Sequence, residues 1–99
     1  MLSEAWILET ENITIGRLEL IEIDQPWFRC RFSPADGWEA AKEIFEEQAA
    51  AVDSGNAIAM VGPIEAVKQM DLKLFPVSGG DPITPVIIQI RGETASFRY

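Results

Sequence analysis

Residues 33–56 have the sequence SPADGWEAAKEIFEEQAAAVDSGN, and this stretch predicts a long helix in the middle of the chain. Ser33 supplies a capping hydroxyl, Pro34 suits the first helical position, and Asp36 follows three residues after the cap. The sequence DSGN at residues 53–56 is typical of the end of a helix. We therefore expect a helix that begins just after Ser33 and ends at these four residues.

The predicted helix is amphipathic. At about 100° per residue, its apolar side chains fall within one half-turn and its charged side chains fall on the opposite half. We expect the apolar half to pack on the core. The apolar half consists of Trp38, Ala41, Ile44, Phe45, Ala49, Ala51 and Val52. The opposite half consists of Glu39, Lys42, Glu43, Glu46, Glu47 and Asp53.

A second apolar stripe of helical spacing follows from Ala57 to about Met70. Gly62 and Pro63 interrupt it, and proline cannot donate a backbone hydrogen bond within a helix. Because proline is well tolerated in a first turn, we expect the second helix to begin or to kink at Pro63.

Alternating apolar and polar residues flank the helical block on both sides and predict β-strands. In the second strand the apolar positions change parity at Gly16, which predicts a β-bulge there. Between the last two strands, Gly92 and Glu93 fit a type II′ hairpin turn, and such a turn places Arg91 opposite Thr94. The predicted strands are residues 5–10, 13–23, 27–32, 72–77, 85–91 and 94–99.

These elements follow one another in the order β-β-β-α-α-β-β-β, which favours an α+β fold with an antiparallel sheet. We predict one α+β domain over residues 1–99, with a single sheet of about five or six strands and both helices on one face. The length of 99 residues suits one core of that size. Phe45 and Phe97 are expected in that core.

The composition excludes several kinds of catalytic site. The chain contains no histidine and one cysteine, so it cannot assemble a Ser-His-Asp triad, a Cys-His pair or the usual zinc and haem ligand sets. Cys30 shares a strand face with Phe28 and Phe32, which favours a buried and unreactive thiol. The Gly79-Gly80 loop lacks the Gly-Lys-Ser/Thr sequence of a phosphate-binding loop. We expect no metal and no cofactor, and the composition favours a non-enzymatic protein without excluding an enzyme.

The first residues carry no recognisable targeting signal. Residues 1–11 lack a basic stretch, and Glu4 comes before any apolar run of signal-peptide length. The longest apolar run, Ala57–Val61, is far shorter than the ~20 residues of a membrane-spanning helix. We therefore expect a cytoplasmic protein.

The charged residues are unevenly distributed on the predicted fold. Sixteen Asp and Glu against eight Lys and Arg give a net charge of −8, which repels nucleic acids and anionic membranes. If the helices cover one face of the sheet, strand alternation places a basic and aromatic set of residues on the other face. That set is Trp27, Arg29, Arg31, Lys73, Phe75, Arg91 and Arg98, with Gln89 on the same face.

This open sheet face has two interpretations. In the first, glutamates on neighbouring strands pair with the arginines across the sheet, as opposite charges commonly do. In the second, the face is a docking surface, because Arg and Trp are frequent anchors of protein interfaces. Single-stranded RNA is disfavoured as a ligand by the net charge and by the lack of lysine clusters.

The acidic side of the predicted helix also has two interpretations. Its glutamates stand about one turn apart or adjacent, and like charges at this spacing repel one another. They form either a solvated face or a docking surface for a basic partner. A Mg²⁺ or Ca²⁺ site is disfavoured because one straight helix cannot wrap around an ion. These glutamates are Glu39, Glu43, Glu46 and Glu47.

We therefore expect a non-enzymatic intracellular binding module, such as an adaptor, an inhibitor or an immunity-type protein, which docks through the acidic helix or the arginine-bearing sheet face. One alternative is a small enzyme or small-molecule carrier that uses Glu22 or Asp24 in a cleft between helices and sheet. Another is a homodimer in which the C-terminal strand, ending at Tyr99, lies at a sheet edge and pairs with its mate. The expected partner is another protein or a second copy of this chain, with no membrane and no nucleic acid.

Overall fold

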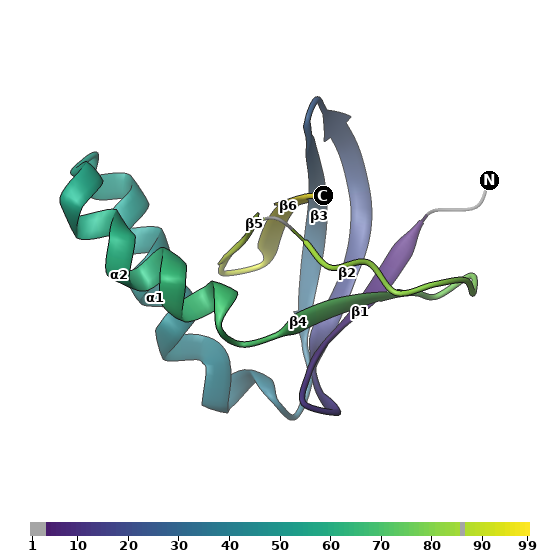
Figure 1. Cartoon of the computed structure of the whole chain (residues 1–99). Helices are drawn as coiled ribbons and strands as arrows, with labels where there is room; N and C mark the ends of the chain where they lie inside the picture. The colour runs from purple at the N-terminus through teal and green to yellow at the C-terminus, as the bar shows by residue number, and fades with distance from the viewer. Residues whose placement is uncertain (1–3, 86) are drawn as a thin grey trace.

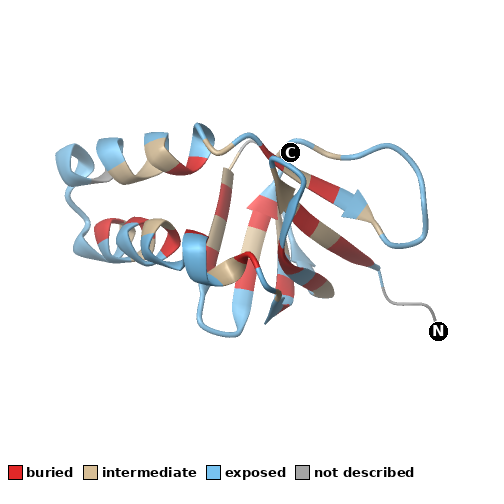
Figure 2. Ribbon diagram, turned by 90° about the horizontal axis from the view of Figure 1, so that it is seen from below, coloured by how far each residue is buried: buried red, intermediate tan, exposed pale blue. Residues whose placement is uncertain are grey.

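Six antiparallel strands form one curled sheet, and two helices lie on one side of it (Figures 1 and 2). The computed structural model describes residues 4–85 and 87–99. The strand order across the sheet is β4-β1-β2-β3-β6-β5. This arrangement confirms the predicted α+β fold and the predicted order of elements. The elements are β1 (Ala5–Thr10), β2 (Ile13–Asp24), β3 (Trp27–Pro34), α1 (Trp38–Ser54), α2 (Ala57–Lys68), β4 (Leu72–Pro76), β5 (Ile87–Arg91) and β6 (Thr94–Arg98).

The core lies between α1 and the inner face of the sheet, where buried residues are concentrated (Figure 2). Phe45 of α1 and Phe97 of β6 are both 0% exposed, as predicted. Helix α1 contacts β5 and β2, and α2 packs against α1. Neither helix of the described residues has the length and apolar character that a bilayer crossing requires.

A β-bulge bends β2 at the position that the sequence predicts. Leu8 pairs with Gly16 and Glu9 pairs with Thr14, so that Ile15 is the extra residue of β2. A Cβ atom on Gly16 would lie 2.4 Å from the Phe32 ring, which explains why a glycine is needed there. The bulge turns both Ile15 and Gly16 into the core.

The register of the last hairpin also agrees with the prediction. Arg91 pairs with Thr94, and Ile88 pairs with Phe97. Gly92 has a φ of 57°, a left-handed value that glycine adopts without strain. One face of this hairpin therefore reaches the core and the other remains open.

The predicted start of the first helix is wrong. Helix α1 begins at Trp38, and its N-cap residue Gly37 makes no side-chain capping bond. Ser33 and Pro34 instead continue β3, where Pro34 pairs with Gly16. Pairing with the bulged strand β2 thus replaces the local cap that the sequence favoured.

Of the two alternatives for the second helix, the structure contradicts the one in which it begins at Pro63. Helix α2 starts at Ala57 and runs through Pro63, so it does not begin at the proline. The Asn56 side chain accepts hydrogen bonds from the backbone N–H groups of Ile58 at 3.0 Å and Ala59 at 3.3 Å. The end of α1 agrees with the prediction, because Gly55 caps it with a φ of 69°.

The C-terminal strand is not at a sheet edge. β6 lies between β3 and β5, so the predicted homodimer contact through β6 is wrong. β4 and β5 are the edge strands. Ile83 covers part of the β4 edge, where it exchanges two backbone hydrogen bonds of 2.8 Å with Leu74.

Candidate functional site

The open faces of β3, β6 and β5 bring the predicted docking residues together. Arg29 of β3 pairs with Ser96 of β6, which pairs with Gln89 of β5. One step along the sheet, Thr94 of β6 stands between Arg31 and Arg91 in the same way. Strand alternation places Trp27 of β3 and Arg98 of β6 on the same face. We call the basic and aromatic members of this surface the arginine face; they are Trp27, Arg29, Arg31, Arg91 and Arg98.

The arginine face is hollowed at its centre. The hollow has a volume of about 410 Å³. It arises because the middle strand β6 presents the short side chains of Ser96 and Thr94, whereas the strands on either side present long ones. Ile21, which is 63% exposed, lies at the hollow because a second bulge in β2 leaves it unpaired. The surface therefore combines a depression, exposed apolar area and guanidinium groups.

Two of the arginines on this face already have acidic partners. The Arg29 guanidinium lies 3.0 Å from the Asp24 carboxylate and 3.7 Å from that of Glu22. Arg91 reaches Asp53 at the end of α1, with an N–O distance of 2.5 Å. All these side chains are at least 40% exposed, so the pairs add little to stability.

Arg31 and Arg98 differ from the other two. No carboxylate among residues 4–85 and 87–99 lies within ion-pair distance of either guanidinium. Pairing with glutamates of neighbouring strands thus accounts for Arg29 but not for Arg31 or Arg98. Lys73, the remaining basic residue predicted for the open face, lies on β4 beside Asp71, at a distance of 3.8 Å.

The carboxylates proposed for catalysis do not lie between helices and sheet. Glu22 and Asp24 stand at the exposed end of the β2–β3 hairpin, with 61% and 62% of their side chains exposed. Glu22 and Asp24 therefore do not form the cleft between helices and sheet that the alternative of a small enzyme or carrier placed them in. No group of three or more potential metal ligands occurs in the described part of the chain.

The acidic residues of α1 are exposed along the helix. Glu39, Glu43 and Glu47 point to solvent, and Glu46 lines a shallow groove between α1 and the β5–β6 hairpin. The exposure of these four glutamates agrees with a solvated face. Among the described residues, Glu46 is the member of this row that lines the groove, together with Trp38, Ala49 and Ile90.

Cys30 is buried, as the sequence predicts. It is 1% exposed, and its thiol donates a weak hydrogen bond to the carbonyl oxygen of Phe28 at 3.9 Å. Burial raises the pKa of the Cys30 thiol to about 12, which keeps it protonated and unreactive at neutral pH.

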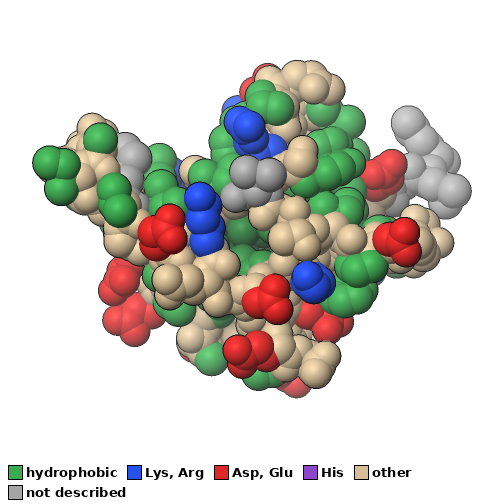
Figure 3. Space-filling view, viewed as in Figure 1, with side chains coloured by type: hydrophobic (Ala, Val, Ile, Leu, Met, Phe, Trp, Pro, Cys, Tyr) green, Lys and Arg blue, Asp and Glu red, His purple; other side chains and the backbone are tan. Residues whose placement is uncertain are grey.

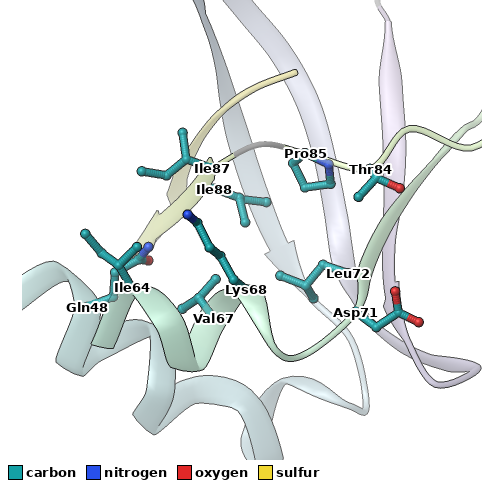
Figure 4. A pocket seen from close by; sticks show the side chains of 10 residues that line it. All are labelled: Gln48, Ile64, Val67, Lys68, Asp71, Leu72, Thr84, Pro85, Ile87 and Ile88. Carbon is teal, nitrogen blue, oxygen red and sulfur yellow. The ribbon is translucent and has the colours of Figure 1, made fainter. Parts of the chain in front are cut away.

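A second pocket, which the sequence did not predict, lies between α1, α2 and the strand β5 (Figure 4). It has a volume of about 220 Å³. In the space-filling view the surface between the helices and the sheet is hollowed, with hydrophobic side chains beside a basic one (Figure 3). We call it the Gln48 pocket; its lining is Gln48, Ile64, Val67, Lys68, Asp71, Leu72, Thr84, Pro85, Ile87 and Ile88.

Gln48 is the unusual residue of this pocket. It is 1% exposed, and neither its Oε1 nor its Nε2 atom has a hydrogen-bond partner among the described residues. A signal for it exists in the sequence. Gln48 follows Phe45 by three residues and Ala41 by seven, so it falls inside the apolar half of α1 although it is polar.

The chain matches no protein-family model, no curated protein and no solved structure at a significant level. Function is therefore inferred from the geometry and chemistry of these surfaces.

Proposed function

We propose that this chain is a non-enzymatic binding module that docks an acidic segment of another protein on the arginine face. The observation that carries the proposal is the hollow lined by Trp27, Arg29 and Gln89. It lies on the same sheet face as Arg31 and Arg98, which have no acidic partner among the described residues. Arg and Trp anchor interfaces because they bury large areas and still make directional contacts at their polar ends.

The charge of the face favours carboxylates on the partner. Arg31 and Arg98 offer guanidinium groups that can each hold a carboxylate through two parallel hydrogen bonds. Arg29 is shared between Glu22 and Asp24, so a competing carboxylate would gain less there. Trp27 and Ile21 add apolar contact area at the hollow. An extended segment with acidic residues on both sides of an apolar one fits this pattern.

The arginine face is preferred to the acidic helix for a geometric reason. A docking surface needs a place where a side chain of the partner is desolvated, and such places carry most of the binding energy. The hollow of the arginine face provides one among Trp27, Arg29 and Gln89. Glu39, Glu43 and Glu47 line neither this hollow nor the groove beside Glu46.

The proposal can be tested by selecting binders from a random peptide library displayed on phage, with the wild-type protein as the target. The recovered peptides are then titrated against two double variants. Arg31→Glu with Arg98→Glu reverses two charges on the arginine face. Glu43→Lys with Glu47→Lys reverses two charges on α1 and serves as the matched control, since all four residues are exposed.

We expect the recovered peptides to be rich in Asp and Glu and to bind the arginine double variant at least about tenfold more weakly, mainly through slower association. Added salt should weaken wild-type binding in the same direction. The α1 double variant should bind as wild type or better. The proposal would be contradicted if the peptides bound the arginine double variant as tightly as the wild-type protein. Tighter binding of oligouridine than of any peptide would also contradict it.

A further inference from the structure

The buried amide of Gln48 requires a partner that the described residues do not supply. Buried polar groups in proteins are nearly always hydrogen-bonded, because an unpaired donor or acceptor loses its contacts with water and gains nothing in return. A glutamine carboxamide has two N–H donors and one acceptor oxygen. In Gln48 both ends of the group lack a partner, although the residue is 1% exposed.

The surroundings of Gln48 form a built pocket rather than a packing defect. Gln48 reaches it from α1, Ile64 and Lys68 reach it from α2, and Ile87 and Ile88 reach it from β5 (Figure 4). The volume of about 220 Å³ exceeds the ~150 Å³ of a cavity known to hold benzene. A single ring of six or seven atoms therefore fits inside.

The Lys68 side chain lies at the Gln48 pocket. Its side chain extends from α2 toward β5 across the pocket (Figure 4). No salt bridge or hydrogen bond holds the Lys68 ammonium to any other described residue. An exposed and unrestrained lysine side chain changes rotamer within nanoseconds, so it can swing aside and open the way to Gln48.

We propose that the Gln48 pocket binds a small cyclic amide, that is, a lactam or a ring imide on a largely apolar body. The carbonyl oxygen of such a ring accepts a hydrogen bond from Nε2 of Gln48, and its N–H donates one to Oε1. The apolar part of the ring contacts Ile64, Val67 and Ile88. A carboxylate would satisfy Nε2 and leave Oε1 unpaired, and a hydrocarbon would leave both unpaired.

This site is independent of the proposed docking function. The Gln48 pocket lies between the helices and the sheet, whereas the arginine face is the open side of β3, β6 and β5, and the two share no lining residue. Loss of peptide binding in the arginine double variant therefore has no bearing on the amide site.

The test uses ε-caprolactam as the probe and cycloheptanone, a ring of the same size without the N–H, as its matched control. Both are titrated into the ¹⁵N-labelled protein while backbone amide shifts are recorded. We expect caprolactam to shift resonances of residues that line the pocket, and cycloheptanone to bind about tenfold more weakly, because it leaves Oε1 of Gln48 unpaired.

Two variants decide where the probe binds. Gln48→Met keeps the length of the side chain and removes both polar ends, so it should abolish the preference for the lactam over the ketone. Ile64→Trp fills the pocket and should abolish binding of both. The spectrum of each free variant reports whether the fold is retained.

Three results would overturn the proposal. The first is an absence of saturable shifts with caprolactam up to its solubility limit in the wild-type protein. The second is a lactam preference that survives Gln48→Met. The third is tighter binding of hexanoate than of caprolactam together with loss of hexanoate binding in Lys68→Met, which would make the pocket a carboxylate site.

Discussion

Replacing Gln48 with methionine should make the free protein more stable. The side chain lies on the buried side of α1, is 1% exposed, and has no hydrogen-bond partner for Oε1 or Nε2 among the described residues. Methionine has nearly the same length and flexibility as glutamine, and it fills irregular apolar spaces well. The substitution therefore removes two unpaired polar atoms without opening a large cavity.

The magnitude follows from the cost of burying unpaired groups. A buried donor or acceptor without a partner costs about 1–3 kcal/mol, and glutamine and methionine have similar helix propensities and similar side-chain entropies. Local relaxation around the side chain relieves part of this cost, which places the expected gain at about 1–2 kcal/mol. For a chain of 99 residues this corresponds to a rise in Tm of about 4–12 °C.

The measurement is urea unfolding of the wild-type protein, Gln48→Met and Glu47→Met, each followed by circular dichroism. Glu47 is the adjacent, exposed residue of the same helix, so Glu47→Met should change the unfolding free energy by no more than about 0.5 kcal/mol. A loss of stability in Gln48→Met would refute the reasoning. It would mean that the amide has an internal partner in solution, such as the Lys68 ammonium, which lines the same pocket.

The other predictions concern the core, the bulge, the helix cap and the buried thiol. Phe97→Ala should cost about 3–5 kcal/mol in urea unfolding, since the ring is 0% exposed and contacts other aromatic rings; a loss below 1 kcal/mol would contradict the core assignment. Gly16→Ala should cost about 1–3 kcal/mol because the added Cβ meets the ring of the neighbouring strand at 2.4 Å, and an unchanged midpoint would argue against the bulge. Asn56→Ala should lower the unfolding free energy by about 1 kcal/mol because α2 loses its cap, whereas Ser33→Ala should change it by no more than about 0.5 kcal/mol. A larger loss in Ser33→Ala than in Asn56→Ala would indicate that Ser33 caps α1 after all. The pKa of Cys30 is raised to about 12 in the folded state, so its contribution to stability is complete below the unfolded pKa of ~8.5 and is lost as the pH rises toward 12. Cys30→Ala should therefore show a shallower fall of unfolding free energy over that alkaline range, and identical slopes would show that the thiol ionises normally.

The amino-acid sequence by itself determined those features that depend on neighbouring residues. The alternation of apolar residues and the glycine at position 92 set the register of the β5–β6 hairpin, because a two-residue turn leaves one way to pair the strands. The change of parity at Gly16 located the bulge for the same reason. The apolar stripe of α1 placed Phe45 in the core, and Gly55 ended the helix, since both follow from the periodicity and the dihedral limits of a few residues.

Tertiary structure alone decided the features that depend on residues far apart in the chain. The local signals around Ser33 favour a cap, yet pairing of Pro34 with Gly16 extends β3 because the strand partner offers more contacts than a capping bond. The interior position of β6, and therefore the hollow of the arginine face, requires that the last strand insert beside β3. Gln48 becomes an unpaired amide in a pocket because α2 and β5 close around it. Such outcomes depend on which distant surfaces meet, and no window of local sequence contains that information.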